Sequence, residues 1–175
     1  MSEKLKELIR NIPDFPKKGI VFRDITTLLK DNNGFNEVLD ELYTLAKDKG
    51  ITKVIGIESR GFIFGGALAA KLGAGFVPVR KPGKLPGDIW SVTYTLEYGS
   101  DSIEIHRDAI EKGDKVLIHD DLLDTGGTME AACKLVEKFG AEIAQLSFLV
   151  ELSFLEGKNK LSKYDVKSLI KYDSE

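Results

Sequence analysis

The stretch K-V-L-I-H-D-D-L-L-D-T-G-G-T at residues 115–128 decides the expected fold. Its β-forming residues 116–118 lead to two adjacent carboxylates, Asp120 and Asp121, then to a loop of small residues and helical spacing at 129–139. This order predicts a strand, an acidic edge, a tight loop and a helix. Glycine lets several backbone N–H groups converge on one point, and a helix N-terminus adds partial positive charge. The loop is therefore expected to bind a phosphate.

The acidic pair distinguishes this loop from a general phosphate-binding loop. Carboxylates repel a phosphate but accept hydrogen bonds from sugar hydroxyls, so the expected ligand is a phosphorylated sugar. The candidate residues for binding this ligand are Asp120, Asp121, Asp124, Thr125, Gly126, Gly127 and Thr128. Taken singly, either threonine is compatible with a simple helix N-cap, and the acids with a strand end. The sequence contains neither a P-loop nor a dinucleotide-binding fingerprint.

Composition and charge narrow the class of protein. The 175 residues are most simply one domain, and 42% hydrophobic with 30% charged residues is ordinary for a globular protein. A net charge of −3 argues against a polyanion-binding surface, so no nucleic-acid partner is expected. The single cysteine, Cys133, excludes an internal disulfide and is expected to be buried in a helix. Since no signal peptide or membrane-spanning apolar run is found, we expect a soluble cytoplasmic protein without a membrane partner.

Strand and helix patterns alternate along the rest of the chain. Apolar runs predict strands at 53–57, 75–79, 143–152 and 166–170, and helical spacing predicts helices at 3–10, 34–49, 62–72 and 154–161. The alternation indicates an α/β fold with a mostly parallel five-stranded sheet flanked by helices. Segments alternating at 90–98 and 102–106 predict an inserted hairpin, a candidate lid. The tail 171–175 is expected to lie outside the core, and the surroundings of His119 in its strand are expected to satisfy it.

Two further segments are candidates for binding an anion. Arg60 follows the strand at 53–57, in the sequence E-S-R-G. Ligands of open α/β sheets lie beyond such strand ends, where a guanidinium suits a pyrophosphate, although a surface cation is the alternative. Residues 80–86, R-K-P-G-K-L-P, form a basic cluster in an acidic protein. This basic loop is either a solvated linker or a segment that neutralises a pyrophosphate.

Four motifs resemble one known family. Residues 115–128 resemble the phosphoribosyl-pyrophosphate motif of the type I phosphoribosyltransferases, whose acids hold the ribose hydroxyls and whose loop holds the 5′-phosphate. D-F-P-K-K-G-I-V-F-R-D-I-T-T-L-L at 14–29 is similar to the N-terminal hood of the adenine enzymes of that family, and L-E-Y-G at 96–99 to their flap. E-S-R-G at 58–61 is similar to the family's pyrophosphate loop, which usually contains a cis non-proline peptide. The resemblance covers nearly the whole chain.

The resemblance implies a type I phosphoribosyltransferase fold in one domain, 1–175, with a hood at 1–34 and a flap hairpin at 86–106. Phe22 would stack on the purine, while the Val21 carbonyl and the Arg23 amide read its amino edge. Glu97 would lie near the purine N7, with Tyr98 beside it in the flap. The pyrophosphate-binding residues would be Glu58, Ser59, Arg60, Arg80, Lys81 and Lys84.

The implied activity is purine salvage, in which adenine and 5-phosphoribosyl-1-pyrophosphate give AMP and pyrophosphate. Mg²⁺ would bridge the pyrophosphate and the ribose, with Asp120 and Asp121 acting mostly through the sugar or bound waters. A homodimer is expected, because the basic loop of related dimers reaches the neighbouring site.

One position departs from the adenine family. Asp124 stands where those enzymes usually carry a small residue, and it resembles the aspartate near N7 in hypoxanthine-guanine enzymes. Glu97 and Asp124 are thus both candidate catalytic residues. Two alternatives remain, a 6-oxopurine (hypoxanthine, guanine or xanthine) phosphoribosyltransferase and a non-enzymatic regulator that binds phosphoribosyl pyrophosphate.

Overall fold

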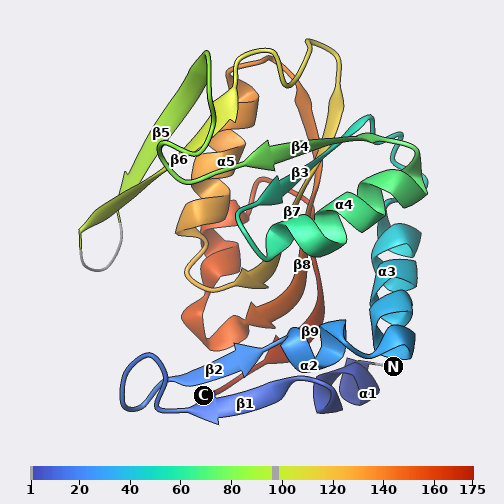
Figure 1. Ribbon diagram of the computed structural model, residues 1–175, viewed down its shortest axis with the longest axis vertical. Coiled ribbons are helices and arrows are strands. Elements are labelled where there is room, and N and C mark those ends of the chain that lie inside the picture. Colours follow the sequence, from blue (N-terminus) through green and yellow to red (C-terminus); the bar gives the residue numbers. More distant parts are fainter. Residues whose placement is uncertain (1, 96–98) are drawn as a thin grey trace.

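The computed structural model describes residues 2–95 and 99–175. Its centre is a five-stranded sheet in the order β4-β3-β7-β8-β9 (Figure 1). The strands are β3 (Lys53–Ile57), β4 (Gly75–Val79), β7 (Lys115–Leu123), β8 (Glu142–Leu152) and β9 (Val166–Tyr172). All four pairings are parallel. The expected five-stranded parallel sheet is confirmed, and 166–170 lies in an edge strand as predicted.

Helices cover both faces of the sheet, as Figure 1 shows. The long helices are α3 (Asn32–Ala46), α4 (Gly61–Leu72) and α5 (Gly127–Glu137). The short ones are α1 (Ser2–Glu7), α2 (Thr26–Leu29) and the 3₁₀ helices η1 (Ser153–Leu155) and η2 (Gly157–Leu161). Within the described residues, no helix is long and apolar enough to span a bilayer.

Alternation along the strands builds two cores, one on each face. On β3, Val54 packs with the side chains of α3 and α4, whereas its neighbour Ile55 packs with those of α5. Leu117 and Ile118 divide in the same way on β7. Cys133 is buried in α5 as expected, and burial raises the pKa of its thiol to about 12.

Two antiparallel hairpins flank the carboxyl ends of β3 and β7 (Figure 1). Within the hood, β1 (Arg10–Pro13) pairs with β2 (Val21–Asp24). Within the flap, β5 (Ile89–Thr95) pairs with β6 (Ser100–His106). The backbone of Arg80, just after β4, donates to and accepts from Glu104 of β6, at 3.0 and 2.8 Å. The flap strands are therefore tied to the basic loop by main-chain hydrogen bonds.

Three predicted elements differ from the structure. β7 continues through the acidic pair to Leu123, because its later residues pair with β8 as far as Glu151. The acids therefore lie within the strand, not past its end. The helix expected at 154–161 is instead two 3₁₀ helices, interrupted by Glu156 in the left-handed conformation, with φ of +54°. The first helix ends at Glu7, before the β1 strand that pairs with β2.

Two expectations about polar residues and the core were wrong. Tyr172 of the tail is only 7% exposed and packs in the core beside α1, so residues 171–175 do not all lie outside it. His119 is fully buried, and its Nδ1 lies 3.1 Å from the Ser147 hydroxyl. Its Nε2 has no hydrogen-bond partner within the part of the chain that the structure describes, so its surroundings satisfy it only in part. Burial lowers the pKa of His119 to about 4, which keeps the imidazole neutral.

An ion pair fastens the hood. The Asp24 carboxylate accepts from the Thr26 hydroxyl at 2.7 Å and from Arg10 Nε at 2.9 Å. These hydrogen bonds, with that from the Thr26 amide, lower the pKa of Asp24 to about 2. Because the folded pKa lies below the ordinary value of 3.8, ionised Asp24 stabilises the fold above about pH 4, and this stability is lost as the pH falls through 2.

We expect Asp24→Asn to lower the free energy of unfolding by about 1–2 kcal/mol at pH 7. The difference from the unchanged protein should shrink between pH 4 and about pH 2, where Asp24 is itself protonated. Denaturant unfolding at each pH measures the difference, with Asp48→Asn, at an exposed residue just after α3, as the control. A difference that stays constant across this range would contradict the assignment.

Candidate active site

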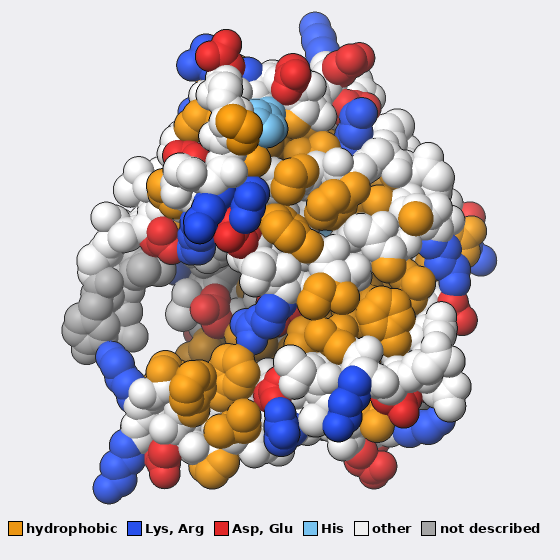
Figure 2. Space-filling view, viewed as in Figure 1, with side chains coloured by type: hydrophobic (Ala, Val, Ile, Leu, Met, Phe, Trp, Pro, Cys, Tyr) orange, Lys and Arg blue, Asp and Glu red, His pale blue; other side chains and the backbone are white. Residues whose placement is uncertain are grey.

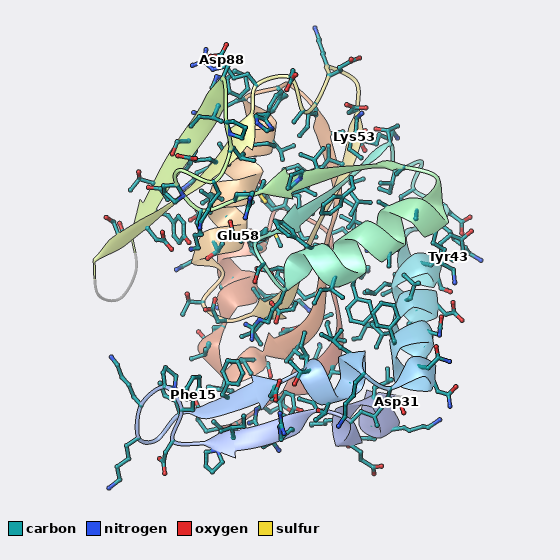
Figure 3. All side chains as sticks on the ribbon, in the orientation of Figure 1. Phe15, Asp31, Tyr43, Lys53, Glu58 and Asp88 are labelled. Carbon is teal, nitrogen blue, oxygen red and sulfur yellow. The ribbon has the colours of Figure 1, made fainter. Side chains whose placement is uncertain are left out.

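One pocket lies at the carboxyl end of the sheet, between the flap and the hood, where Figure 2 shows the face hollowed. Figure 3 labels Glu58 beside it, at the opposite end of β3 from Lys53. The predicted residues that line the pocket are Glu58, Ser59, Arg60, Lys81, Asp120, Asp121, Asp124, Gly126 and Thr128. Of the other described candidates, Arg80, Lys84, Thr125, Gly127, Val21, Phe22 and Arg23 do not line it. The structure thus joins the acidic pair, the phosphate loop and part of both anion-binding segments.

The acidic pair lies beside one cation, with Asp121 buried and Asp120 half-buried. Arg60 Nε donates to the Asp121 carboxylate at 2.8 Å, and the Asp121 side chain is only 7% exposed. Burial, and then the charge of Asp121, raise the pKa of Asp120 well above its ordinary value. Burial also raises the pKa of Asp121, although the Arg60 guanidinium opposes that rise. Two carboxylates held in this way favour ligands that bring hydrogen-bond donors or positive charge.

A glycine brings the anion-binding loop against the acidic strand. A Cβ added to Gly61, at the start of α4, would lie 2.9 Å from the His119 carbonyl and 3.0 Å from Asp120 Oδ1. Both neighbours belong to β7, so a larger residue would push E-S-R-G away from the pair. The peptide between Glu58 and Ser59 is cis, as the family resemblance implied.

The phosphate loop depends on Gly126. Its φ is +79°, and an added Cβ would lie 2.6 Å from the carbonyl oxygen of Gly157 in η2. The Gly126 N–H donates to Asp124 Oδ1 at 3.3 Å. At Gly127 an added Cβ would meet only the Tyr94 ring at 3.7 Å and a carbonyl oxygen at 4.0 Å, which are ordinary contacts. Sequence reasoning missed Gly157, because nothing in the local pattern E-G-K-N-K links it to a loop thirty residues earlier.

Glu58 holds the basic loop in place. Its carboxylate accepts from the Lys81 backbone N–H at 2.9 Å and from Arg80 Nε at 3.2 Å. The Lys81 hydrogen bond is the main cause that lowers the pKa of Glu58, against the effect of burial. Arg80 Nη1 donates at 3.4 Å to the Lys84 carbonyl. The Glu58 side chain therefore positions the basic loop by hydrogen bonds. Lys81 is the cation of that loop that reaches the pocket.

The hood approaches the pocket through an aromatic ring. The Arg60 guanidinium carbon lies 5.3 Å from the centre of the Phe22 ring, within the range of a cation–π contact. Phe15 packs edge-on against the same ring at 5.3 Å. The Val21 N–H donates to Glu175 at 2.9 Å, and the Arg23 guanidinium lies 4.1 Å from the centre of the Tyr172 ring. Two residues near the end of the chain, Tyr172 and Glu175, therefore contact the hood and support it.

Glu97 and Tyr98 lie outside the described residues. Across 2–95 and 99–175, no three His, Cys, Asp or Glu side chains are grouped so that they could hold a metal ion. The Asp120 and Asp121 oxygens suit Mg²⁺, but oxygens of a substrate or water would have to complete its octahedral shell.

Comparison with known proteins identifies the family. The phosphoribosyl transferase domain family matches residues 25–174. The adenine phosphoribosyltransferase of Acidobacterium capsulatum is 59% identical over 170 residues, which cover 97% of this chain and 94% of that protein. That of Thermotoga neapolitana is 56% identical, with 96% and 99% covered.

Solved structures show the same relationship. The adenine phosphoribosyltransferase of Thermoanaerobacter pseudethanolicus is 52% identical with a TM-score of 0.95, and the match covers 98% of this chain and 100% of that one. The enzyme of Saccharomyces cerevisiae, solved with adenine and an imino-altritol bisphosphate, is 41% identical with a TM-score of 0.92 and covers 96% and 97%. The chain therefore belongs to the phosphoribosyltransferase family and, within it, to the adenine phosphoribosyltransferases.

Proposed function

We propose that this chain transfers the phosphoribosyl group of 5-phosphoribosyl-1-pyrophosphate to adenine, forming AMP and releasing pyrophosphate in purine salvage. The observation that carries the proposal is the single pocket in which an acidic pair, a glycine-containing phosphate loop and two cations meet. The names of its relatives and the adenine bound in the yeast structure support the choice of base. A cytoplasmic location fits the single buried thiol of Cys133.

The proposed chemistry is electrostatic and positional. Cleavage of the anomeric C1–O bond develops positive charge on the ribose ring and negative charge on the departing pyrophosphate. Arg60 and Lys81 line the pocket with positive charge that would offset the pyrophosphate. The carboxylates of Asp120 and Asp121 would accept from the ribose hydroxyls, and the loop at Asp124, Gly126 and Thr128 would fix the 5′-phosphate. The remaining assignments, Thr125 and Gly127 to the phosphate and Ser59 to the pyrophosphate, follow the family motif.

Mg²⁺ is proposed as the cofactor. Bound to the substrate, it would supply positive charge that neutralises the pyrophosphate as the bond breaks. Asp120 and Asp121 are the side chains placed to orient it, through the ribose hydroxyls or bound waters. Among the described residues, only one cation, Arg60, lies against the two carboxylates, so a further positive charge would be favourable there.

Adenine would bind at the hood. Phe22 offers an aromatic face beside Arg60, and a purine between the ring and the pocket would lie near the ribose C1. The Val21 carbonyl and the Arg23 amide lie on alternate residues of β2, so they point towards the same edge of the strand. One acceptor and one donor on that edge match the amino group and N1 of adenine.

The test of the function is incubation with Mg²⁺, phosphoribosyl pyrophosphate and, separately, adenine, hypoxanthine, guanine and xanthine. We expect AMP and pyrophosphate from adenine and far slower turnover of the other bases. Preferred turnover of a 6-oxopurine would establish that alternative. If the protein binds phosphoribosyl pyrophosphate but turns over none of the four bases, the regulator becomes the better account.

The catalytic assignment gives a second prediction. Glu97→Ala should lose about 10²- to 10⁴-fold in kcat with adenine, the usual worth of general acid–base catalysis. Asp124→Ala should lose much less and should keep adenine as the preferred base. Asp124 is already engaged with the Gly126 N–H, which fits a loop-forming acid better than a proton donor to N7.

Steady-state kinetics of the two variants with adenine and hypoxanthine provide the measurement. The control is Asp88→Ala, which removes a flap carboxylate that Figure 3 places at the end of the hairpin far from Glu58. If Asp124→Ala loses most of its kcat with adenine while Glu97→Ala does not, the catalytic roles are reversed and 6-oxopurine specificity gains support.

A homodimer is proposed from two surfaces. Ile63 is 40% exposed and Phe76 38% exposed, on α4 and the neighbouring edge strand β4. Figure 2 shows hydrophobic side chains gathered over this part of the face. Lys84 of the adjacent basic loop is exposed and does not line its own pocket, so it could reach a neighbouring subunit, whereas Arg80 is paired with Glu58. An apolar patch beside a basic loop suits an interface with twofold symmetry.

We expect light scattering after gel filtration to give the mass of two chains. Ile63→Lys should shift the protein towards the monomer, because it buries a charge in the interface. Leu155→Lys, at a side chain that is equally exposed on η1, is the matched control and should leave the mass unchanged. A fully active protein with the mass of one chain would contradict the dimer.

A further inference from the structure

The hydroxyl of Tyr94 lies where three separate segments meet. Tyr94 is in β5 of the flap and is only 9% exposed. Its hydroxyl is 3.2 Å from Thr128 Oγ1, 3.4 Å from Lys81 Nζ and 3.2 Å from Asp101 Oδ2. Thr128 belongs to the phosphate loop and Lys81 to the basic loop, whereas Asp101 is on β6 beside Tyr94.

The three contacts use the full hydrogen-bonding capacity of this hydroxyl. A tyrosine hydroxyl donates one hydrogen bond and accepts two. Thr128 and Lys81 act as donors to it, and its own proton goes to the Asp101 carboxylate. Lys81 also forms an ion pair with Asp101, so Lys81, Tyr94 and Asp101 all contact one another. The Tyr94 hydroxyl therefore has all its hydrogen bonds within the protein, before any substrate binds.

We propose that Tyr94 is a positioning residue that fixes Thr128 and Lys81 for the two phosphate groups of one substrate. Because the Thr128 hydroxyl gives its single proton to Tyr94, Thr128 would meet the 5′-phosphate through its backbone N–H at the start of α5. This inference rests on the proposed function, in which Thr128 serves the 5′-phosphate and Lys81 the pyrophosphate. Tyr94 touches neither group and acts through the two residues it orients. Asp101 completes the arrangement by fixing the direction of the Tyr94 hydroxyl and the place of the Lys81 ammonium.

The charges in the network agree with this role. Burial opposes the charge of Lys81, but Asp101 and Tyr94 outweigh it and keep the pKa of Lys81 above its ordinary value. The Lys81 hydrogen bond likewise lowers the pKa of Asp101. An ammonium has three donors, and this network uses two, so the third is free to meet an anion. Because a lysine side chain is costly to immobilise, holding it beforehand strengthens binding.

Tyr94→Phe tests the proposal, because it removes the hydroxyl and keeps the buried ring. We expect the Kd for phosphoribosyl pyrophosphate with Mg²⁺, measured by calorimetry, to rise about 5- to 30-fold, the worth of one or two immobilised side chains and their hydrogen bonds. In kinetics, the KM for phosphoribosyl pyrophosphate should rise by the same factor, while kcat and the KM for adenine change little. The melting temperature should stay close to that of the unchanged protein.

The matched control is Thr93→Val, which removes the neighbouring hydroxyl of the same strand, one that pairs with Ser102. It should bind phosphoribosyl pyrophosphate as the unchanged protein does. If Tyr94→Phe lowers the melting temperature substantially, Asp101→Asn replaces it and should show the same rise in Kd. Unchanged affinity in the folded variant would overturn the proposal. Calorimetry measures binding without turnover. If the protein without substitutions binds phosphoribosyl pyrophosphate but forms no AMP, the proposed function is refuted, and the proposal for Tyr94 is still decided by the change in Kd.

Discussion

The arrangement of this site depends on two adjacent carboxylates in the last part of β7, of which Asp121 is buried and Asp120 half-buried. Asp120 and Asp121 are held in a place where burial raises the pKa of both, and Arg60 offsets only part of the repulsion. Holding two such carboxylates together costs free energy unless a ligand supplies hydrogen-bond donors or positive charge. Sugar hydroxyls would supply the donors and a divalent cation the positive charge, which is why the acids, and not the phosphate loop alone, indicate a phosphorylated sugar as the ligand.

Close backbone contact is the second constraint. Gly61 lets the E-S-R-G turn rest on β7, and Gly126 lets the phosphate loop rest on the main chain at Gly157. Both loops are therefore placed by contacts that a side chain would prevent. Side-chain hydrogen bonds then position the cations around these loops. Glu58 fixes the backbone of the basic loop, and Tyr94 orients the Lys81 ammonium.

Much of this was predictable from local pattern. The strands at 53–57 and 75–79 have the predicted bounds, because short apolar runs between turns leave little choice. The acids were identified by their spacing, but their place inside β7 depends on pairing with β8, which no local pattern reports. Gly157 and the Tyr94 network were missed for the same reason, since each joins segments distant in sequence. The buried Tyr172 was missed because a polar tail gave no sign that it would brace the hood.

The most direct test of the account is a crystal structure of the protein with Mg²⁺ and phosphoribosyl pyrophosphate bound. The account predicts the ribose hydroxyls within hydrogen-bond distance of Asp120 and Asp121, the 5′-phosphate at the loop that contains Gly126, and the pyrophosphate beside Arg60. A substrate bound elsewhere, with no group facing the two carboxylates, would contradict the claim that the acidic pair selects a phosphorylated sugar.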